Sequence, residues 1–331
     1  MDFFNDHKKL FSSALAFFLC LTLVICILPA LDNQRVIQPL PNAKHLTAQE
    51  TRGKLIYIRE GCVACHTQQV RNIDMDQVFG SRPSLSADYA LNKRMSFLQN
   101  TATLMGSERT GPDLTNIGAR QPSKEWQFTH LYNPRAVVPA SIMPSFKWMF
   151  IEKEQLGPND IEVSVPDEFK KGVKGKIVAS QDAKDLVAYL LSLKQVELPS
   201  NIPVREFLYK SEKKEAANSG KGGNLPDGAA LYTANCVACH QASGEGLPGA
   251  FPPLKGSSVV LGNDLELYIT IIMKGYNARV PEYGVMPPVG TTANFKPEEV
   301  AAIMNHERTS WGNNAKEVTA EEVKAIMDKI K

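Results

Sequence analysis

The five-residue stretch Cys-Val-Ala-Cys-His occurs twice in the chain, at positions 62–66 and again at 236–240. Two cysteines three residues apart on a short turn can form thioether bonds to the two vinyl groups of one porphyrin. The histidine that follows is then held under the iron as an axial ligand. The sequence therefore predicts two covalently bound c-type haems. The residues predicted to hold them are Cys62, Cys65 and His66 for the first, and Cys236, Cys239 and His240 for the second.

Paired cysteines also occur in zinc sites and in redox-active dithiols. Zinc would need two more ligands near each pair, and each pair here has one adjacent histidine. A thioredoxin-like dithiol does not require a histidine after the second cysteine, and no alternation of strands and helices surrounds either pair. Covalent haem is therefore the prediction, and a structural zinc-binding membrane protein is the alternative from a different class.

The sequence around the two motifs repeats in the same order. Gly53-Lys-Leu-Ile-Tyr57 precedes the first motif, and Gly228-Ala-Ala-Leu-Tyr232 precedes the second. Each motif is followed by a Pro-x-Leu, then by a Met-Pro, and then by a helix-like stretch. Because the order of the elements is the same, we expect two domains of one fold.

Capping signals predict where several helices begin. Thr47 and Thr319 each precede a glutamate by three residues, which is the spacing of a capping box. Ser180 is placed to cap the helix that follows it, and Pro297 is placed in the first turn of another. Short amphipathic helices are therefore expected on both sides of each haem motif.

The sixth ligand of each iron is predicted to be a methionine. Met143 and Met286 lie on loops in which the next residue is proline, and a thioether ligand suits electron transfer because it raises the potential and closes the iron to other ligands. In the first domain His130, Met95 and Met105 compete with Met143. Three other methionines fall at helical spacing among apolar residues and are expected in the core: Met273, Met304 and Met327.

Two prolines are predicted to orient the axial histidines. An axial histidine usually donates its other ring N–H to a carbonyl, which fixes the orientation of the ring. Pro112 and Pro252 stand in the Pro-x-Leu that follows each motif and are placed to present that carbonyl. The alternative for both is an ordinary turn residue.

An uncharged run extends from Leu10 to Leu31 and exceeds the roughly 20 residues needed to span a bilayer as a helix. The alternative is a cleaved signal peptide, but Leu28-Pro-Ala30 is a poor cleavage pattern and the run is long for a signal core. Lys8 and Lys9 precede the run and favour a cytoplasmic N-terminus, although Arg35 weakens the asymmetry. We therefore predict an uncleaved single-pass anchor in a bacterial cytoplasmic membrane, with the haem domains on the periplasmic side.

Composition limits the other possibilities. The 331 residues carry a net charge of +2, which gives no indication of a nucleic-acid partner. Two of the six cysteines, Cys20 and Cys26, lie in the apolar run, and the other four belong to the haem motifs, so no soluble cysteine is left for a disulfide framework. The segment from Asp227 to Lys331 holds 9 Lys and Arg against 12 Asp and Glu, a net charge of −3. An acidic surface of this kind could steer a basic donor cytochrome toward the second domain. The alternative is an ordinary solvated surface with no role in binding.

The predicted organisation follows from these signals. A polar stretch rich in Lys, Ser and Gly separates the two repeats and is typical of a flexible linker. The predicted segments are a cytoplasmic N-terminus at 1–9, the anchor at 10–31, a first domain at 45–196, the linker at 197–225 and a second domain at 226–331.

Residues 53–193 resemble the membrane-anchored mono-haem subunit, subunit II, of cbb3-type cytochrome c oxidases. Four stretches carry this resemblance: Gly61-Cys-Val-Ala-Cys-His-Thr-Gln-Gln-Val-Arg71, Glu108-Arg-Thr-Gly-Pro-Asp-Leu114, His130-Leu-Tyr-Asn-Pro-Arg135 and Val138-Pro-Ala-Ser-Ile-Met-Pro-Ser-Phe146. The long interval between His66 and Pro112 is also typical of that family.

The remainder of the chain, from Pro226, resembles a class I cytochrome c. Its matching stretches are Phe251-Pro-Pro-Leu-Lys-Gly256, Val285-Met-Pro-Pro288 and Ser310-Trp-Gly-Asn313. The expected fold is mostly α, with one transmembrane helix followed by two class I cytochrome c domains. The family's usual subunit ends after the first domain, so the fused second domain is a departure from its pattern.

The resemblance implies a non-catalytic electron-transfer subunit of an aerobic respiratory complex. Its expected partners are an integral-membrane haem–copper catalytic subunit, other oxidase subunits and a soluble donor cytochrome. Electrons are expected to enter at the second domain and to leave from the first. Two rivals share the same parts: a subunit of a related nitric oxide reductase, and the cytochrome subunit of a periplasmic dehydrogenase, in which electrons would run the other way.

Overall fold

The chain divides into two compact units in a computed structural model that describes residues 3–36, 44–89, 104–208, 225–280 and 282–330. The first unit comprises Met1–Leu46, Leu85–Leu104 and Val196–Pro199; the second comprises Thr47–Ser84, Met105–Gln195 and Ser200–Lys331. Both haem motifs belong to the second unit. The predicted domain boundaries stay predictions, and residues 209–224 of the predicted linker lie outside the described residues.

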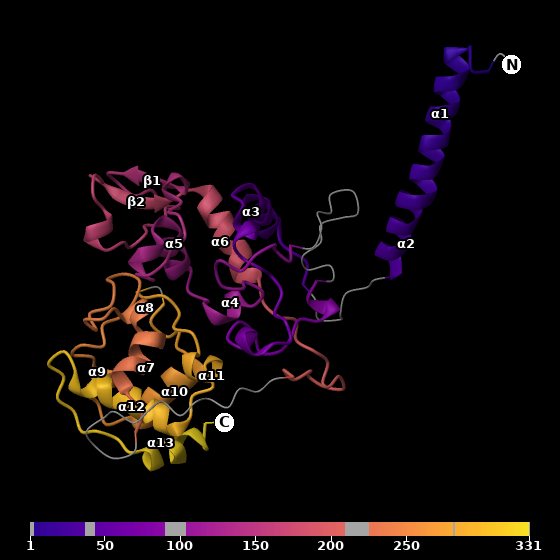
Figure 1. Ribbon diagram of the computed structural model, residues 1–331. Helices are drawn as coiled ribbons and strands as arrows, with labels where there is room; N and C mark the ends of the chain where they lie inside the picture. Colours follow the sequence, from indigo (N-terminus) through magenta and orange to yellow (C-terminus); the bar gives the residue numbers. More distant parts are fainter. Residues whose placement is uncertain (1–2, 37–43, 90–103, 209–224, 281, 331) are drawn as a thin grey trace. The chain divides into compact units, whose positions relative to one another are not determined.

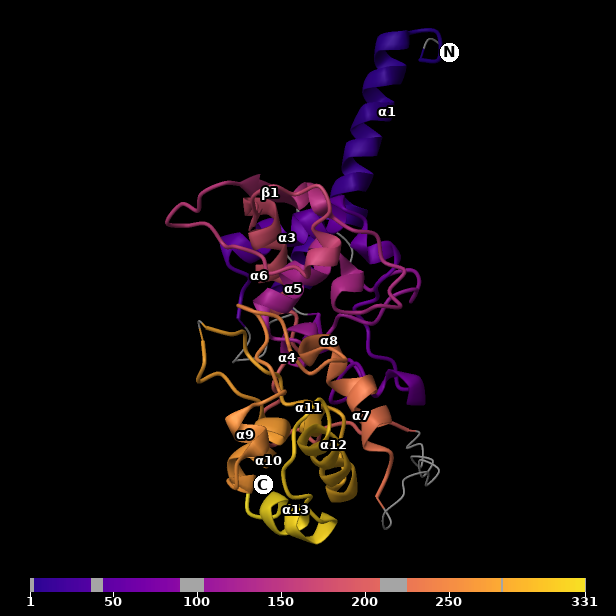
Figure 2. The ribbon, with the colours of Figure 1, turned by 90° about the vertical axis from the view of Figure 1, so that its left-hand side faces the viewer.

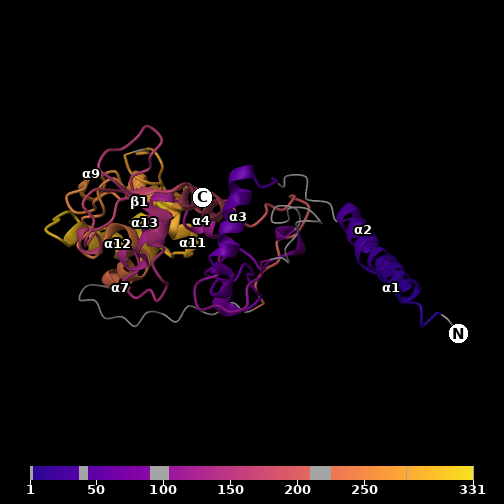
Figure 3. The ribbon, with the colours of Figure 1, turned by 90° about the horizontal axis from the view of Figure 1, so that it is seen from above.

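The first unit contains one long helical segment near the N-terminus. It consists of α1 (His7–Leu21), a π-helical stretch (Thr22–Ile27) and α2 (Leu28–Val36), which continue one another in Figure 3. Asp6 caps its start by accepting bonds from the backbone N–H groups of Lys8 and Lys9. Pro29 has no N–H and its ring crowds the preceding turn, which explains why the wider π-helical turn lies just before it.

Residues His7–Asn33 of this segment form a helix long and apolar enough to cross a membrane. Its apolar side chains are exposed in the structure, as Phe17, Phe18 and Ile25 illustrate. Exposed side chains of this kind suit contact with lipid. The predicted apolar run is therefore confirmed as a single helix.

The second unit is mostly helical, as predicted. The helices around the first haem motif are α3 (Ala48–Arg59), α4 (Ile117–Arg120), α5 (Lys124–Tyr132) and α6 (Gln181–Ser192). Those around the second are α7 (Gly228–Asn235), α8 (Val237–His240), α9 (Ser258–Leu261), α10 (Leu265–Lys274), α11 (Val289–Thr292), α12 (Pro297–Thr309) and α13 (Ala320–Met327). Single 3₁₀ turns of this unit lie at Cys62–Ala64, Asp74–Asp76, Pro134–Ala136, Lys147–Met149 and Asp167–Phe169, and the first unit has one at Ser86–Asp88.

The predicted helix starts are confirmed. Thr47 and Thr319 form capping boxes with Glu50 and Glu322, and both directions of each box are present. Ser180 caps α6 by accepting a bond from the backbone N–H of Ala183.

A two-stranded hairpin in the first half of the unit was not predicted. Strand β1 (Phe150–Lys153) pairs antiparallel with β2 (Lys176–Ala179), with Phe150 opposite Ala179. Each strand is four residues long, too short to give a clear alternating pattern in the sequence. The hairpin leads directly into α6 and so helps to place that helix.

The repeat seen in the sequence corresponds to the same helix packing around both motifs. The helix before the first motif, α3, lies beside α6, as Figures 1 and 2 both show. The helix before the second, α7, packs in the same way against α12. A glycine stands at each crossing: a Cβ on Gly53 would lie 1.9 Å from the carbonyl oxygen of Asp185, and one on Gly228 would lie 2.1 Å from that of Ala302. The two matched glycines therefore allow the same close approach of two backbones.

Buried side chains fill the space behind each pair of helices. In the first, Tyr57 and Tyr189 are fully buried and their rings meet edge to face at 5.5 Å. In the second, Ile269, Ile303 and Met304 lie at the centre of a cluster built from α10, α12 and α13 (Figure 2). Met273 and Met327 pack against this cluster, so the prediction that these methionines belong to the core is confirmed.

We expect Gly228→Ala to destabilise the second helix pair, because the new methyl group has no room against Ala302. Overpacking of this kind costs about 1–3 kcal/mol in the free energy of unfolding. Denaturant unfolding of the haem-loaded protein measures the loss. The matched control is Ala229→Ser at the exposed neighbouring position, which should change stability by less than about 0.5 kcal/mol. Equal midpoints for the two variants would contradict the close packing.

Candidate haem-binding sites

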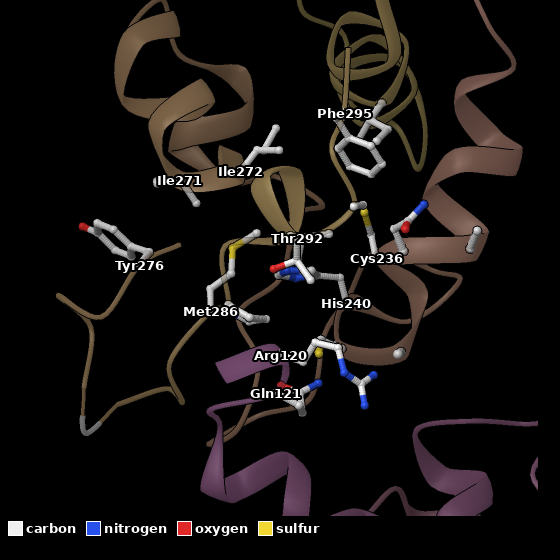
Figure 4. A pocket seen from close by; sticks show the side chains of 18 of the residues that line it. Arg120, Gln121, Cys236, His240, Ile271, Ile272, Tyr276, Met286, Thr292 and Phe295 are labelled. Atoms are coloured by element: carbon white, nitrogen blue, oxygen red, sulfur yellow. The ribbon is translucent and has the colours of Figure 1, made fainter. Parts of the chain in front are cut away.

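The second motif lies in a cavity of about 1230 Å³. Its lining includes Cys236, Cys239 and His240 from the motif, together with Pro252 and Met286. His240 and Met286 both reach this cavity from separate segments of the chain, as Figure 4 shows. All five residues predicted for the second site are thus brought together.

Apolar side chains and a fixed backbone complete this cavity. Ile272, Phe295 and Ile303 are buried residues on its wall. Met286 is held by a backbone bridge: its N–H donates to the carbonyl of Tyr276 at 2.8 Å, and its carbonyl accepts from the N–H of Tyr276 at 3.0 Å. A large, mostly apolar pocket with a few convergent polar groups is the environment that a porphyrin requires. The residues present therefore fit a haem.

The first motif forms a turn with the same hydrogen bonds. The N–H of His66 donates to the carbonyl of Cys62 at 3.0 Å, as the N–H of His240 does to Cys236 at 3.0 Å. Behind the turns, the hydroxyl groups of Tyr57 and Tyr232 donate to the carbonyls of His66 and Gln241. These contacts fix both histidines relative to their cysteines.

Each motif histidine contacts the carbonyl of the predicted proline. His66 Nδ1 lies 2.8 Å from the carbonyl oxygen of Pro112, and His240 Nδ1 lies 2.9 Å from that of Pro252. With Nδ1 donating to the carbonyl, Nε2 keeps its lone pair for a metal ion. The structure thus pairs each histidine with the proline expected from the sequence.

Burial lowers the pKa of His66 and His240, and the proline carbonyls oppose this only in part. Both imidazoles are therefore neutral at pH 7, which is the form that coordinates a metal.

The cysteine thiols differ from those of a redox dithiol. Burial raises the pKa of Cys62 and of Cys239 to about 12, and it raises the pKa of Cys236 well above its ordinary value. Catalytic dithiols work with a lowered pKa because the thiolate is the nucleophile. These sites thus lack the activation that the redox alternative requires.

A buried carboxylate ties the first motif to the segment that carries Pro112. Asp113 is fully buried and accepts bonds from the hydroxyl of Thr67 at 2.6 Å and the N–H of Gln69 at 2.7 Å. Its other oxygen accepts from the N–H of Thr115 at 2.8 Å. Sequence reasoning gave Asp113 no role. Its place directly after Pro112 explains why the first Pro-x-Leu contains aspartate.

Met143 lies on a loop that Arg135 holds. The guanidinium donates to the carbonyls of Ser141 and Met143 at 3.0 and 3.1 Å, and to the hydroxyl of Ser145 at 3.2 Å. Among the described residues, no hydrogen bond joins Met143 to His66. The structure therefore brings Cys62, Cys65, His66 and Pro112 together but leaves Met143 as a prediction.

The competing residues of the first site occupy different surroundings. His130 stacks on Trp126 with ring centroids 4.5 Å apart, and its buried Nδ1 has no hydrogen-bond partner among the residues that the structure describes. Burial, and next the proximity of His66, lower the pKa of His130 to about 4. Met105 is exposed, and Met95 lies outside the described residues. His130 is thus the competitor with structural support.

Two protein-family models match the chain, one in each of the two parts for which the sequence showed a resemblance. Residues 2–170 match the model of the family described as "Cytochrome C oxidase, mono-heme subunit/FixO". Residues 225–311 match the model of cytochrome c, the family of proteins that bind haem c covalently.

Individual relatives point to electron-transfer proteins. Cytochrome c-552 of Thermus thermophilus is 40% identical over 114 residues, which are 31% of this chain and 86% of the relative. The cytochrome c subunit of a quinone-dependent alcohol dehydrogenase from Gluconobacter oxydans is 29% identical over 147 residues, 41% of this chain and 28% of the relative. The fructose dehydrogenase cytochrome subunit of Gluconobacter japonicus is 33% identical over 105 residues, 30% of this chain and 22% of the relative. The chain thus spans less than a third of either dehydrogenase subunit.

Proposed function

The chain belongs to the family of mono-haem cytochrome c oxidase subunits and carries an additional cytochrome c domain, and from this premise we propose that it is a dihaem electron-transfer subunit. It takes electrons from a periplasmic donor and delivers them to the catalytic subunit of a cbb3-type haem–copper oxidase. The observation that carries the proposal is the second cavity, where Cys236, Cys239, His240 and Met286 converge.

The proposed roles of the residues follow the sequence prediction, and the cavity of the second motif supports those of Cys236, Cys239, His240 and Met286. Cys62 and Cys65 hold the first haem, and Cys236 and Cys239 hold the second. His66 and Met143 are the axial ligands of the first iron, and His240 and Met286 are those of the second. Pro112 and Pro252 orient the two histidines. Bound haem c supplies one-electron oxidation and reduction at its iron.

The position of the proposed anchor, directly before the first domain, supports different roles for the two domains. It ends at Val36, and α3 begins at Ala48, so only a short connection separates the helix proposed to span the membrane from the first domain. We therefore place the first domain next to the integral catalytic subunit, with the N-terminus in the cytoplasm and both domains in the periplasm. The second domain then meets the soluble donor.

A dehydrogenase cytochrome subunit is the second candidate, favoured by the likeness to the alcohol and fructose dehydrogenase subunits. In that case the electron flow reverses, from a substrate-oxidising partner into this chain. Co-purification separates the two functions, because the oxidase proposal requires a multi-span haem–copper subunit in the complex.

A chain truncated after Leu198 tests the division of tasks. We expect it to assemble with the catalytic subunit and keep the first haem, since α3, α6 and the contacts of His66 all precede this point. Its turnover with the soluble donor should fall steeply, while a small artificial reductant restores part of it. Oxygen consumption with each reductant is the measurement.

The control is the full-length chain with Cys236 and Cys239 both replaced by alanine, which keeps the second domain but removes its haem attachment. Full turnover of the truncated complex with its donor would show that the second domain is not the entry point. Assembly of the control but not of the truncated chain would show that the second domain holds the complex together.

A further inference from the structure

Helix α12 carries a carboxylate on its buried face. Val300, Ile303, Met304 and Glu307 follow one another at helical spacing, and all four are buried. Glu307 is only 4% exposed, although glutamate is rarely buried without a partner. Sequence reasoning gave Glu307 no role.

Glu307 borders the cavity of the second haem motif, as His240 and Met286 do. Its side chain accepts a short hydrogen bond from the hydroxyl of Tyr268 on α10, which is also buried and also lines the cavity. Neither His240 nor Met286 is among its hydrogen-bond or charge partners. Glu307 thus lies at the wall of the cavity without a hydrogen bond to either proposed ligand of the second iron.

No cation among the described residues forms an ion pair with Glu307. The neighbouring Arg308 is buried too, but its guanidinium donates to the carbonyls of Lys316 at 2.6 Å, Val260 at 2.7 Å and Gly262 at 3.1 Å. Glu307 therefore relies on one neutral donor, and a buried carboxylate with so little support favours the protonated form.

Apart from Arg308, whose guanidinium donates to those carbonyls, the described helices packed around Glu307 present no buried cation to it. Helix α7 presents Tyr232 and the nearby Cys236, whose sulfur becomes a thioether when haem is attached. Helix α10 presents Tyr268, and α12 itself adds His306 and Arg308. Helix α9 has no ionisable side chain, and the charged residues of α13 are exposed.

Burial raises the pKa of Glu307 to about 7, and the bond from Tyr268 offsets only part of this rise. The group therefore changes charge near neutral pH, where ordinary glutamates do not.

We propose that Glu307 is a redox-linked proton acceptor for the second haem, an inference that rests on the proposed function of that site. With haem bound at this site, one-electron reduction of its iron by the donor cytochrome would be accompanied by uptake of one proton from the bulk solvent at the Glu307 carboxylate, which becomes a carboxylic acid. When the iron gives the electron up, Glu307 returns the proton.

The coupling has a definite sign. Oxidised haem carries one more positive charge than reduced haem, and a nearby positive charge favours the carboxylate. Glu307 therefore holds its proton more tightly in the reduced protein, and the potential of the second haem falls as pH rises through the interval between the two pKa values. The limit is one proton per electron, which is about 59 mV for each tenfold change in proton concentration.

Redox titration of the full-length, haem-loaded chain at pH values from 5 to 9, with the spectrum as readout, tests the inference. The component shifted by Met286→His is assigned to the second haem. We expect its potential to fall with pH in the native chain and to be nearly independent of pH through this interval in Glu307→Gln. Glu307→Asp should restore the slope. Tyr268→Phe should move the pH interval in which the potential falls to higher pH, because the carboxylate loses its hydrogen-bond donor.

Glu298→Gln is the matched control: Glu298 is an exposed carboxylate on the same helix, and its variant should keep the slope. An unchanged slope in Glu307→Gln would overturn the inference. If Glu307→Gln does not fold, Tyr268→Phe decides the question: the inference is overturned if the potential of this variant falls over the same pH interval as in the native chain. A chain without a second haem would overturn the proposed function as well, and it is recognised by haem content before any titration.

Discussion

Replacing Cys236 and Cys239 together by alanine should leave a chain that carries one covalent haem instead of two. The hydrogen bonds that hold His66 come from the first repeat, although Arg120 and Gln121 of that repeat also line the cavity of the second motif. His66 is held by Cys62, Tyr57 and Pro112, and within the described part of the chain none of its hydrogen bonds involves the second motif. The first haem should therefore attach normally, and haem absorbance per chain should fall by half.

The chain offers a matched control for this experiment. Cys20 and Cys26 lie in the long N-terminal helix, and replacing both by alanine changes the same number of thiols. That variant should keep two haems. If the chain lacking Cys236 and Cys239 accumulates without any haem, the two sites do not load independently, and the repeat is not a pair of self-contained domains.

Exchanging Met286 for histidine should lower the potential of the second haem by on the order of 100 mV while the iron stays low-spin. Imidazole lacks the preference of a thioether for ferrous iron, and the backbone bridge to Tyr276 should hold the new side chain at the cavity. Spectroscopic redox titration gives both the potential and the spin state. Met273→Leu is the control, because Met273 packs against the core and should leave the potential unchanged.

An unchanged second potential in Met286→His would remove Met286 from the ligand set. The same exchange at Met143 decides the first site. A lowered first potential would support Met143, whereas an unchanged one would favour His130, whose buried Nδ1 has no hydrogen-bond partner.

Much of the fold could be predicted because its signals are local. The apolar run is a property of consecutive residues, and the capping boxes at Thr47 and Thr319 need only a threonine and a glutamate three residues later. The repeat was visible because a glycine, at 53 and at 228, is followed four residues later by a tyrosine and then closely by the haem motif in both copies. The structure adds the reason for the glycines, which is the close approach of a second helix.

Other features depend on contacts between distant residues and could not be predicted in the same way. The hairpin of β1 and β2 joins segments separated by more than twenty residues, and neither strand is long enough to show a pattern. Arg135 holds the Met143 loop through backbone carbonyls, which leave no trace in the sequence. Glu307 was overlooked for another reason: a charged residue on an apolar helix face usually lies at its edge, and only the structure shows this one buried at the haem cavity.

The mass of the intact full-length chain tests the central claim most directly. Two thioether-linked haems should give a mass equal to that of the 331-residue polypeptide plus two haem groups, and acidic organic solvent should extract neither group. Fragmentation should place one haem on the peptide containing Cys62 and Cys65 and the other on the peptide containing Cys236 and Cys239. A mass corresponding to one haem or to none, or haem that the solvent extracts, would contradict the account.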